Sequence, residues 1–210
     1  MSYQDRERIA RLRARPPGEG EARTFFNDHT FGRVMVKVLP GEYYVTDEDM
    51  IVSTVLGSCV AVCLTDPGRR IAGMNHFLLP DGGGATGGRY GVYAMELLIN
   101  GLMKAGARRH MLEAKVFGGA AVIRGATAIQ VGQRNVAFVD AFLEREGIRV
   151  VARDVLGSDA RKVLLFPDTG RVLSKRLSEA QPAIEEELRY GRRVAQAAGR
   201  AGAVELFWGT

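Results

Sequence analysis

Short apolar runs divided by turn-forming residues dominate the chain from residue 33 to residue 80. Three of them, RVMVKVL, EYYVT and MIVSTVL, are rich in β-branched residues and are separated by a proline-glycine pair and by an acidic stretch. Runs of this length and composition predict β-strands. Two further runs, CVAVCLT and RIAGMNHFLLP, are joined by an Asp-Pro-Gly segment, which favours a turn, so this pair predicts a β-hairpin.

The pattern changes to helical spacing after a glycine-rich loop at 81–88. In YGVYAMELLINGLMKAG the apolar residues recur every three or four positions up to Gly106, and QRNVAFVDAFLEREG repeats this periodicity up to Gly147. Both segments predict helices with one buried face. Around them, LEAKVF, IRVVARDV, RKVLLFP and RVLSKRL predict further strands.

The two ends of the chain differ from its middle. Residues 1–30 are rich in arginine and contain two prolines, so we expect a loosely held, charged N-terminal extension. Residues 178–210 are expected to form a C-terminal helical extension that ends in an apolar group at 206–208. Such a group either docks a partner or packs back on the domain, and packing is the more frequent outcome. Residues 31–177 then make up the single domain.

Composition and charge limit the class of protein. Of the 210 residues, 46% are hydrophobic, which is enough for one domain with a sizeable core. The net charge is +5, but basic and acidic residues are mixed along the chain, so no nucleic-acid partner is expected. No segment has the apolar pattern of a signal peptide or the length of a membrane span, so we expect a cytoplasmic protein without membrane insertion.

The predicted hairpin brings together the two residues with the clearest chemistry. If its turn is centred between Pro67 and Gly68, paired residue numbers sum to 135, and Cys59 then lies opposite His76. Cross-strand partners have Cβ atoms about 4.5–5.5 Å apart, close enough for a thiol to meet an imidazole. The sequence therefore predicts a Cys/His dyad, provided that the register does not slip by one residue and turn the side chains to opposite faces.

A dyad of this kind suits nucleophilic catalysis. The thiolate is the reactive form of cysteine, and a neighbouring base such as His76 is needed near neutral pH because the pKa of a free thiol is about 8.5. Gly57 and Ser58 precede Cys59 and allow the backbone to bend, so that the N–H groups of residues 58–60 can converge on a developing oxyanion.

Less reactive roles apply to the same residue types. Free cysteine is among the most buried residues, and Cys63, in a run that is apolar on both strand faces, is expected in the core. A merely buried Cys59 stays an alternative to the dyad. Cys59, Cys63 and His76 form a poor zinc signature without a nearby fourth ligand, so neither a metal nor another cofactor is expected.

Several blocks of the chain resemble one known family. TVLGSCVAVCLTDPGRRIAGMNHFLLP, RYGVYAMELLINGLMKAGA, KVFGGAAV, VGQRNVAFVDAFLEREGI and RKVLLFPDTGRV are together similar to the chemoreceptor glutamine deamidases, the CheD family. The resemblance runs from about Arg33 to Leu177, and the combination of LGSC, NHFLLP and RYG is specific.

The resemblance implies a fold, an activity and site residues. The fold is α+β, an α/β/β sandwich related to the deamidase domain of cytotoxic necrotizing factor toxins. The activity is hydrolysis of glutamine side chains on methyl-accepting chemotaxis receptors, with release of ammonia through a thioester. The family's nucleophile falls on Cys59 and its histidine on His76. Its third catalytic residue falls on Ser53, with Thr54 next to it, and which of these two hydroxyls orients the imidazole stays open.

Two further functions stay open at this point. The same thioester chemistry would cleave a glutamyl methyl ester. The alternative from another class of protein is a non-catalytic adaptor. Such an adaptor would bind either receptors or the chemotaxis phosphatase CheC, since members of the family bind CheC. Thiol reactivity distinguishes the two, because a catalytic Cys59 is alkylated faster than a buried structural cysteine.

Overall fold

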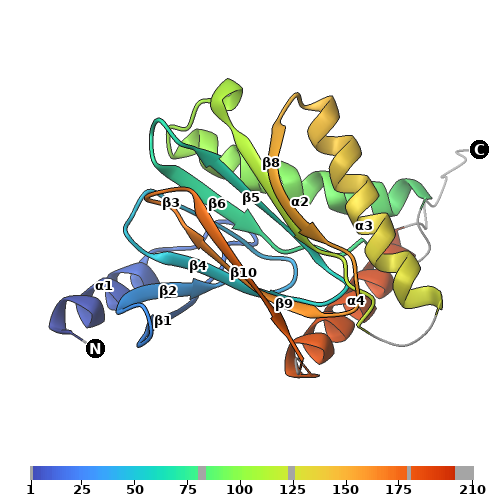
Figure 1. Cartoon of the computed structure of the whole chain (residues 1–210), viewed down its shortest axis with the longest axis horizontal. Coiled ribbons are helices and arrows are strands. Elements are labelled where there is room, and N and C mark those ends of the chain that lie inside the picture. Colours follow the sequence, from blue (N-terminus) through green and yellow to red (C-terminus); the bar gives the residue numbers. More distant parts are fainter. Residues whose placement is uncertain (1, 80–83, 123–125, 179–180, 202–210) are drawn as a thin grey trace, which may run out of the picture.

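The computed structural model describes residues 2–79, 84–122, 126–178 and 181–201 of the chain. These residues form one mixed α and β domain with two five-stranded sheets and four α-helices. Two of the helices, α2 and α3, cover one sheet, and the other sheet packs against the opposite face of that sheet (Figure 1). The α+β class expected from the sequence is confirmed.

The sheet farther from α2 and α3 has the strand order β1-β2-β4-β9-β10. Within it, β2 and β4 run parallel and the other neighbours run antiparallel. Its strands are Thr24–Asp28 (β1), Arg33–Lys37 (β2), Ile51–Leu56 (β4), Ala160–Phe166 (β9) and Arg171–Leu177 (β10).

The sheet that carries α2 and α3 has the order β3-β6-β5-β7-β8. Here β7 and β8 run parallel and the other neighbours run antiparallel. Its strands are Tyr43–Thr46 (β3), Val60–Asp66 (β5), Ile71–Asn75 (β6), Glu113–Gly118 (β7) and Arg149–Val155 (β8). Each run that the sequence analysis predicted as a strand contains a strand.

Strand β5 is central to its sheet and is buried along its whole length. Ala61 and Cys63 belong to the core between the two sheets. Val60, Val62 and Leu64 belong to the core under α2 and α3. Burial on both faces explains why this strand is apolar at consecutive positions instead of alternating. Cys63 is a core residue, as expected.

The helices are Tyr3–Ala14 (α1), Gly84–Lys104 (α2), Ala126–Arg145 (α3) and Gln181–Ala201 (α4), with a 3-10 turn at Arg109–Met111. α2 begins inside the glycine-rich segment that we expected to be a loop, because glycine weakens a helix without forbidding it. Residues 81–83 of that segment lie outside the described residues. Among the residues that are described, none of the helices combines the length and the apolar character needed to cross a membrane.

The N-terminal segment is not loosely held, contrary to the expectation. α1 begins with a capping box, in which Ser2 accepts a hydrogen bond from the N–H of Asp5 and donates its own N–H to the Asp5 carboxylate. Ile9 and Leu12 of this helix are buried in the core, and β1 pairs with β2. The sequence analysis missed this because only these two positions of α1 are apolar and buried, while arginines occupy its exposed face.

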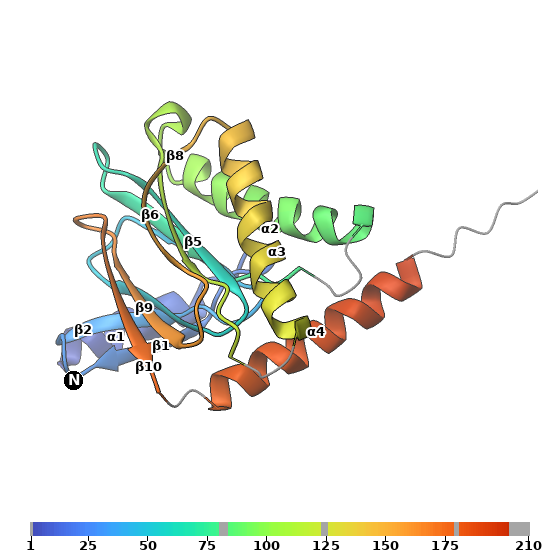
Figure 2. The same cartoon turned by 45° about the vertical axis from the view of Figure 1, so that its right-hand side comes forward.

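Helix α4 lies at one end of the molecule, past the start of α3 (Figure 2). Its contacts include the residues that follow β4. The expected C-terminal helix is therefore present. The apolar group Leu206, Phe207 and Trp208 lies outside the described residues.

A four-residue turn at 67–70 connects β5 to β6. The buried carboxylate of Asp66 organises it by accepting hydrogen bonds from the N–H groups of Gly68 and Arg69. Arg108 adds its backbone N–H and two guanidinium N–H groups. Arg70 has a φ of 56°, which lets the chain reverse before β6.

We expect Asp66→Ala to lower the free energy of unfolding by about 2 kcal/mol, because it leaves several N–H groups without their charged acceptor. The Arg108 side chain holds the pKa of Asp66 well below its usual range. A carboxylate whose pKa is lower in the folded than in the unfolded chain stabilises the fold above pH ~4 and loses this contribution as the pH falls. Urea unfolding at pH 7 and at pH 3 checks both points: the difference from wild type should shrink at pH 3. The exposed Asp47→Ala is the control, and an equal effect there would contradict the assignment.

Candidate active site

The β5–β6 hairpin brings Cys59 and His76 together in a register that differs from the expected one. Val60 bridges Phe77, so paired residue numbers sum to 137 rather than 135. The predicted register is wrong because the turn at 67–70 is centred between Gly68 and Arg69, one residue later than expected. Since side chains alternate with a period of two, a shift by two leaves Cys59 and His76 on the same face as diagonal neighbours.

A third residue completes the group. The sulfur of Cys59, an imidazole nitrogen of His76 and a carboxylate oxygen of Glu187 all lie within 4.8 Å of one another. All three residues are buried. Cys59 immediately precedes β5 and His76 immediately follows β6, while Glu187 comes from α4. The site therefore forms where the C-terminal helix meets one end of the hairpin.

The surroundings of His76 fix its tautomer. Its Nδ1 lies 2.8 Å from the Thr54 Oγ1 atom and 3.4 Å from the carbonyl oxygen of Val38. The Thr54 hydroxyl donates to that same carbonyl at 2.8 Å, so towards His76 it acts as an acceptor. Nδ1 thus carries a proton, and in the neutral ring Nε2 has the free lone pair. Nε2 lies 3.5 Å from Oε1 of Glu187, inside the site.

Of the two neighbouring hydroxyls that the sequence left open, Thr54 contacts the imidazole. Ser53 is also buried, but its Oγ donates to the carbonyl oxygen of Val36 on β2, at 3.1 Å. Adjacent residues of a strand face opposite ways, so only one of them can reach His76 from β4.

Backbone N–H groups converge on the carboxylate of Glu187. Oε1 accepts from the N–H of Gly57 at 2.7 Å. Oε2 accepts from the N–H groups of Ser58 and Cys59, at 2.9 and 3.3 Å, and from the Ser58 hydroxyl at 3.2 Å. A Cβ at Gly57 would lie 3.0 Å from Oε2, so glycine permits this close approach. The N–H of Val60, which we expected to join this group, donates instead to the carbonyl oxygen of Phe77, just after the end of β6.

Two peptide groups point their N–H groups into the site, and each accepts a hydrogen bond at its carbonyl oxygen on the opposite side. The Gly57 carbonyl accepts from the N–H of Ala120 at 2.8 Å, and the Ser58 carbonyl accepts from the Asn135 side chain, also at 2.8 Å. Because C=O and N–H point in opposite directions in a trans peptide, these bonds direct the N–H groups of Ser58 and Cys59 towards the site. Asn135 belongs to α3 and is completely buried.

Charge and burial set the protonation states in the site. Burial raises the pKa of the Cys59 thiol well above its ordinary value, and the charge of Glu187 and a hydrogen bond to it raise the pKa further. Burial alone would also raise the pKa of Glu187, but the imidazolium form of His76, with a proton on Nε2, the Gly57 N–H and the Cys59 thiol outweigh burial and lower that pKa. With α4 in this position, the carboxylate is therefore ionised and the thiol is protonated at neutral pH.

Cys59, His76 and Glu187 also have the donor types of a metal site. Both oxygens of Glu187 already accept hydrogen bonds from the backbone, so the geometry is that of a hydrogen-bonded carboxylate, and we assign no metal to it. Cys63 stands apart from this chemistry, since burial raises the pKa of its thiol to about 12 in the core.

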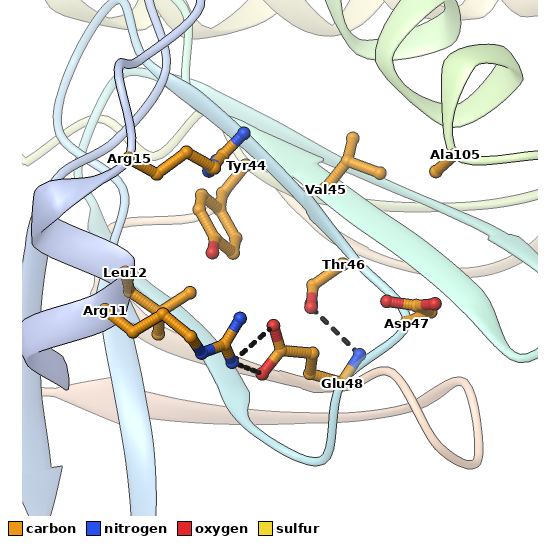
Figure 3. A pocket seen from close by; sticks show the side chains of 9 residues that line it. All are labelled: Arg11, Leu12, Arg15, Tyr44, Val45, Thr46, Asp47, Glu48 and Ala105. Carbon is orange, nitrogen blue, oxygen red and sulfur yellow. Dashed lines mark hydrogen bonds and ion pairs between the residues drawn. The ribbon is translucent and has the colours of Figure 1, made fainter. Parts of the chain in front are cut away.

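A polar pocket lies elsewhere, between α1 and β3 (Figure 3). Arg11 extends across it to the carboxylate of Glu48, which also accepts from Arg8. Tyr44 and Leu12 contribute to its walls. The pocket contains none of the residues of the Cys59 group, and its ion pairs attach α1 to the segment after β3.

The sequence analysis did not identify Glu187 and Asn135. In each case a weak signal was present, because a polar residue stands on the apolar face of a predicted helix. Asn135 shares a face with Val139 and Phe142, and Glu187 shares one with Val194. A polar residue in a buried stripe requires a partner, and only the folded chain identifies it.

Several known proteins are similar to this chain in sequence, and solved structures align with part of it. Residues 78–176 match the family described as CheD chemotactic sensory transduction. The protein of Albidiferax ferrireducens named probable chemoreceptor glutamine deamidase CheD 1 is 52% identical over 204 residues, which cover 95% of this chain and 87% of that one. The Herminiimonas arsenicoxydans protein named probable chemoreceptor glutamine deamidase CheD is 49% identical, over 89% of this chain and 95% of that one. Among solved structures, the Bacillus licheniformis hypothetical protein YfiH aligns with a TM-score of 0.38 and 15% identity, over 55% of this chain and 51% of that one.

Proposed function

Because this chain belongs to the CheD family, we propose that it is a chemoreceptor glutamine deamidase, a protein-glutamine glutaminase that converts receptor glutamines to glutamates and releases ammonia. The observation that carries the proposal is the identity of 49–52%, over most of the chain, to relatives with that name. Its substrates are then methyl-accepting chemotaxis receptors. Binding of CheC, a cytoplasmic location and a relation to cytotoxic necrotizing factor toxins stay predictions that rest on the sequence.

We assign the nucleophile to Cys59 and the base to His76. In the first half of the reaction, His76 Nε2 takes the thiol proton, and the sulfur attacks the carboxamide carbon of the substrate glutamine. The C–N bond then breaks, the imidazolium returns the proton to the departing nitrogen, and ammonia leaves a thioester behind. The lone pair at Nε2 and its place beside Cys59 support these roles.

In the second half, His76 takes a proton from water and the water oxygen attacks the thioester carbon. The C–S bond breaks, the sulfur recovers its proton from the imidazolium, and the new glutamate is released. In both halves the carbonyl oxygen of the substrate becomes negative for a moment. The N–H groups of Ser58 and Cys59 are the donors we assign to it, because they already converge on an oxygen in this structure. A glutamyl methyl ester would react in the same way, with methanol as leaving group.

The proposal is tested with a purified cytoplasmic fragment of a methyl-accepting chemotaxis receptor. Incubation with the full chain should release ammonia and increase the mass of the fragment by whole deamidations. Tandem mass spectrometry then locates the converted glutamines. A stable complex without any change in mass would contradict the proposal and support the non-catalytic adaptor instead.

We assign the orientation of His76 to Thr54, and expect Thr54→Val to lower kcat five- to tenfold with KM unchanged. Loss of a hydrogen bond worth about 1 kcal/mol in the transition state corresponds to this factor. The matched control is Ser53→Ala, which removes the adjacent buried hydroxyl that bonds to β2. Steady-state kinetics on the receptor fragment measure both variants. If Ser53→Ala has the larger effect on kcat, the assignment to Thr54 is wrong.

A further inference from the structure

Helix α4 places one charged side chain in the candidate active site. The side chain of Glu187 is only 3% exposed, although many of its neighbours on the helix are exposed. Tyr190, Gly191 and Val194 continue the same face along the helix at spacings of three and four residues. Burying a carboxylate is costly unless other groups compensate for its charge. We call this buried side of α4 its contact face. A glutamate on the contact face therefore requires groups that compensate for its charge.

The two oxygens of Glu187 occupy the places that the reaction requires. Oε2 lies 2.9 Å from the nitrogen of Ser58 and 3.3 Å from that of Cys59, where the substrate oxygen would lie. Oε1 lies 3.5 Å from Nε2 of His76, on the side where ammonia leaves and water enters. A glutamate carboxylate is also the product of the proposed reaction.

We propose that α4 is an internal product analogue, with Glu187 standing where the newly formed glutamate of a substrate stands, so that a receptor helix must displace α4 before it can react. The proposal rests on the proposed function, because it takes the Cys59 group to be the site of deamidation. While α4 is in place, the N–H groups assigned to the oxyanion are occupied. Burial of the site and the charge of the carboxylate together also raise the pKa of the Cys59 thiol and keep it protonated.

The contacts of α4 suit a segment that can leave. The core between the sheets and the core under α2 and α3 are built from residues outside α4, as far as the chain is described. Tyr190 packs against Gly41, where a Cβ would collide with its ring. Glu186 forms a partly exposed ion pair with Lys37, a type of contact that is worth little in water. Release of α4 therefore removes no described residue from either of these two cores.

Kinetics with two variants of the contact face test the proposal. Glu187→Ala removes the carboxylate, and Tyr190→Ala removes the ring that docks on Gly41. If the open form makes up about 1–10% of the full chain, either change should raise the initial rate of receptor deamidation about 10- to 100-fold. Glu185→Ala is the control, since it removes an exposed glutamate from the same helix and should leave the rate unchanged.

A second measurement tests whether the site deamidates a glutamine placed on α4 itself. In the Glu187→Gln variant, the chain carries a glutamine where its own product analogue stood. We expect Cys59 to convert it to glutamate, which peptide mass spectrometry detects at position 187. The double variant Cys59→Ala/Glu187→Gln should keep the glutamine. In the control Glu186→Gln, the glutamine should also persist, because residue 186 is paired with Lys37 outside the site.

The outcomes separate this proposal from the proposed function. A rate increase in both contact-face variants, or conversion at position 187 that depends on Cys59, supports the product analogue. Suppose that the wild-type chain deamidates the receptor fragment, that both contact-face variants match its rate within about threefold, and that position 187 stays a glutamine. In that case the proposal that α4 is a product analogue is wrong, and the proposed function stands. If no chain deamidates the fragment and position 187 is also unchanged, both are wrong.

Discussion

Cys59→Ala is expected to abolish receptor deamidation, with a loss in kcat on the order of 10⁵- to 10⁶-fold, as for removal of a nucleophile from other covalent hydrolases. Alanine has no atom that can form the thioester, and His76 is then left with only water to activate. The backbone N–H groups of residues 58 and 59 remain in place, so the small residual rate would come from oxyanion stabilisation and binding alone.

The chain offers a matched control for this variant. Cys63 lies four residues farther along the same segment, is equally buried and belongs to the same core cluster. Cys63→Ala should therefore have similar consequences for packing but keep the rate within about threefold of wild type. Ammonia release from the receptor fragment measures both, in the full chain and in the Tyr190→Ala background. Equal losses in the two alanine variants would point to a packing defect and contradict the nucleophile assignment.

The dyad was predictable from the sequence because a hairpin is a local structure. Cys59 and His76 are 17 positions apart in the chain, and the short connection at 67–70 allows few registers. The expected register was wrong by two residues, since the sequence does not reveal that the carboxylate of Asp66 organises a four-residue turn. The prediction of a shared face survived because the error was an even number of residues.

The remainder of the site depends on contacts that no local pattern reveals. Glu187 reaches Cys59 from 128 residues away, and Asn135 reaches Ser58 from 77 residues away. Both helices were predicted, although α3 begins at Ala126, before the predicted segment. Helical periodicity gives only the buried face of a helix and not the element that this face meets. The choice between Ser53 and Thr54 likewise required the path of β4 between its neighbours.

His76→Ala is expected to lower kcat about 10²- to 10⁴-fold, the range for loss of general acid-base catalysis. The variant should also change the pH dependence. Burial and Glu187 raise the pKa of the Cys59 thiol well above its ordinary value, so between pH 6 and pH 9 only a small fraction is thiolate. Without a neighbouring base the rate depends on that fraction, which increases tenfold per pH unit below the pKa.

The residual rate of His76→Ala should therefore rise steeply across this range, while the wild-type rate, supported by Nε2, should rise less. Initial rates of ammonia release at several pH values measure both profiles. His110→Ala is the matched control, because His110 is exposed on the turn before β7 and touches none of the site residues described here. A His76→Ala chain that keeps the wild-type profile and a rate within about threefold of wild type would show that another group activates the thiol.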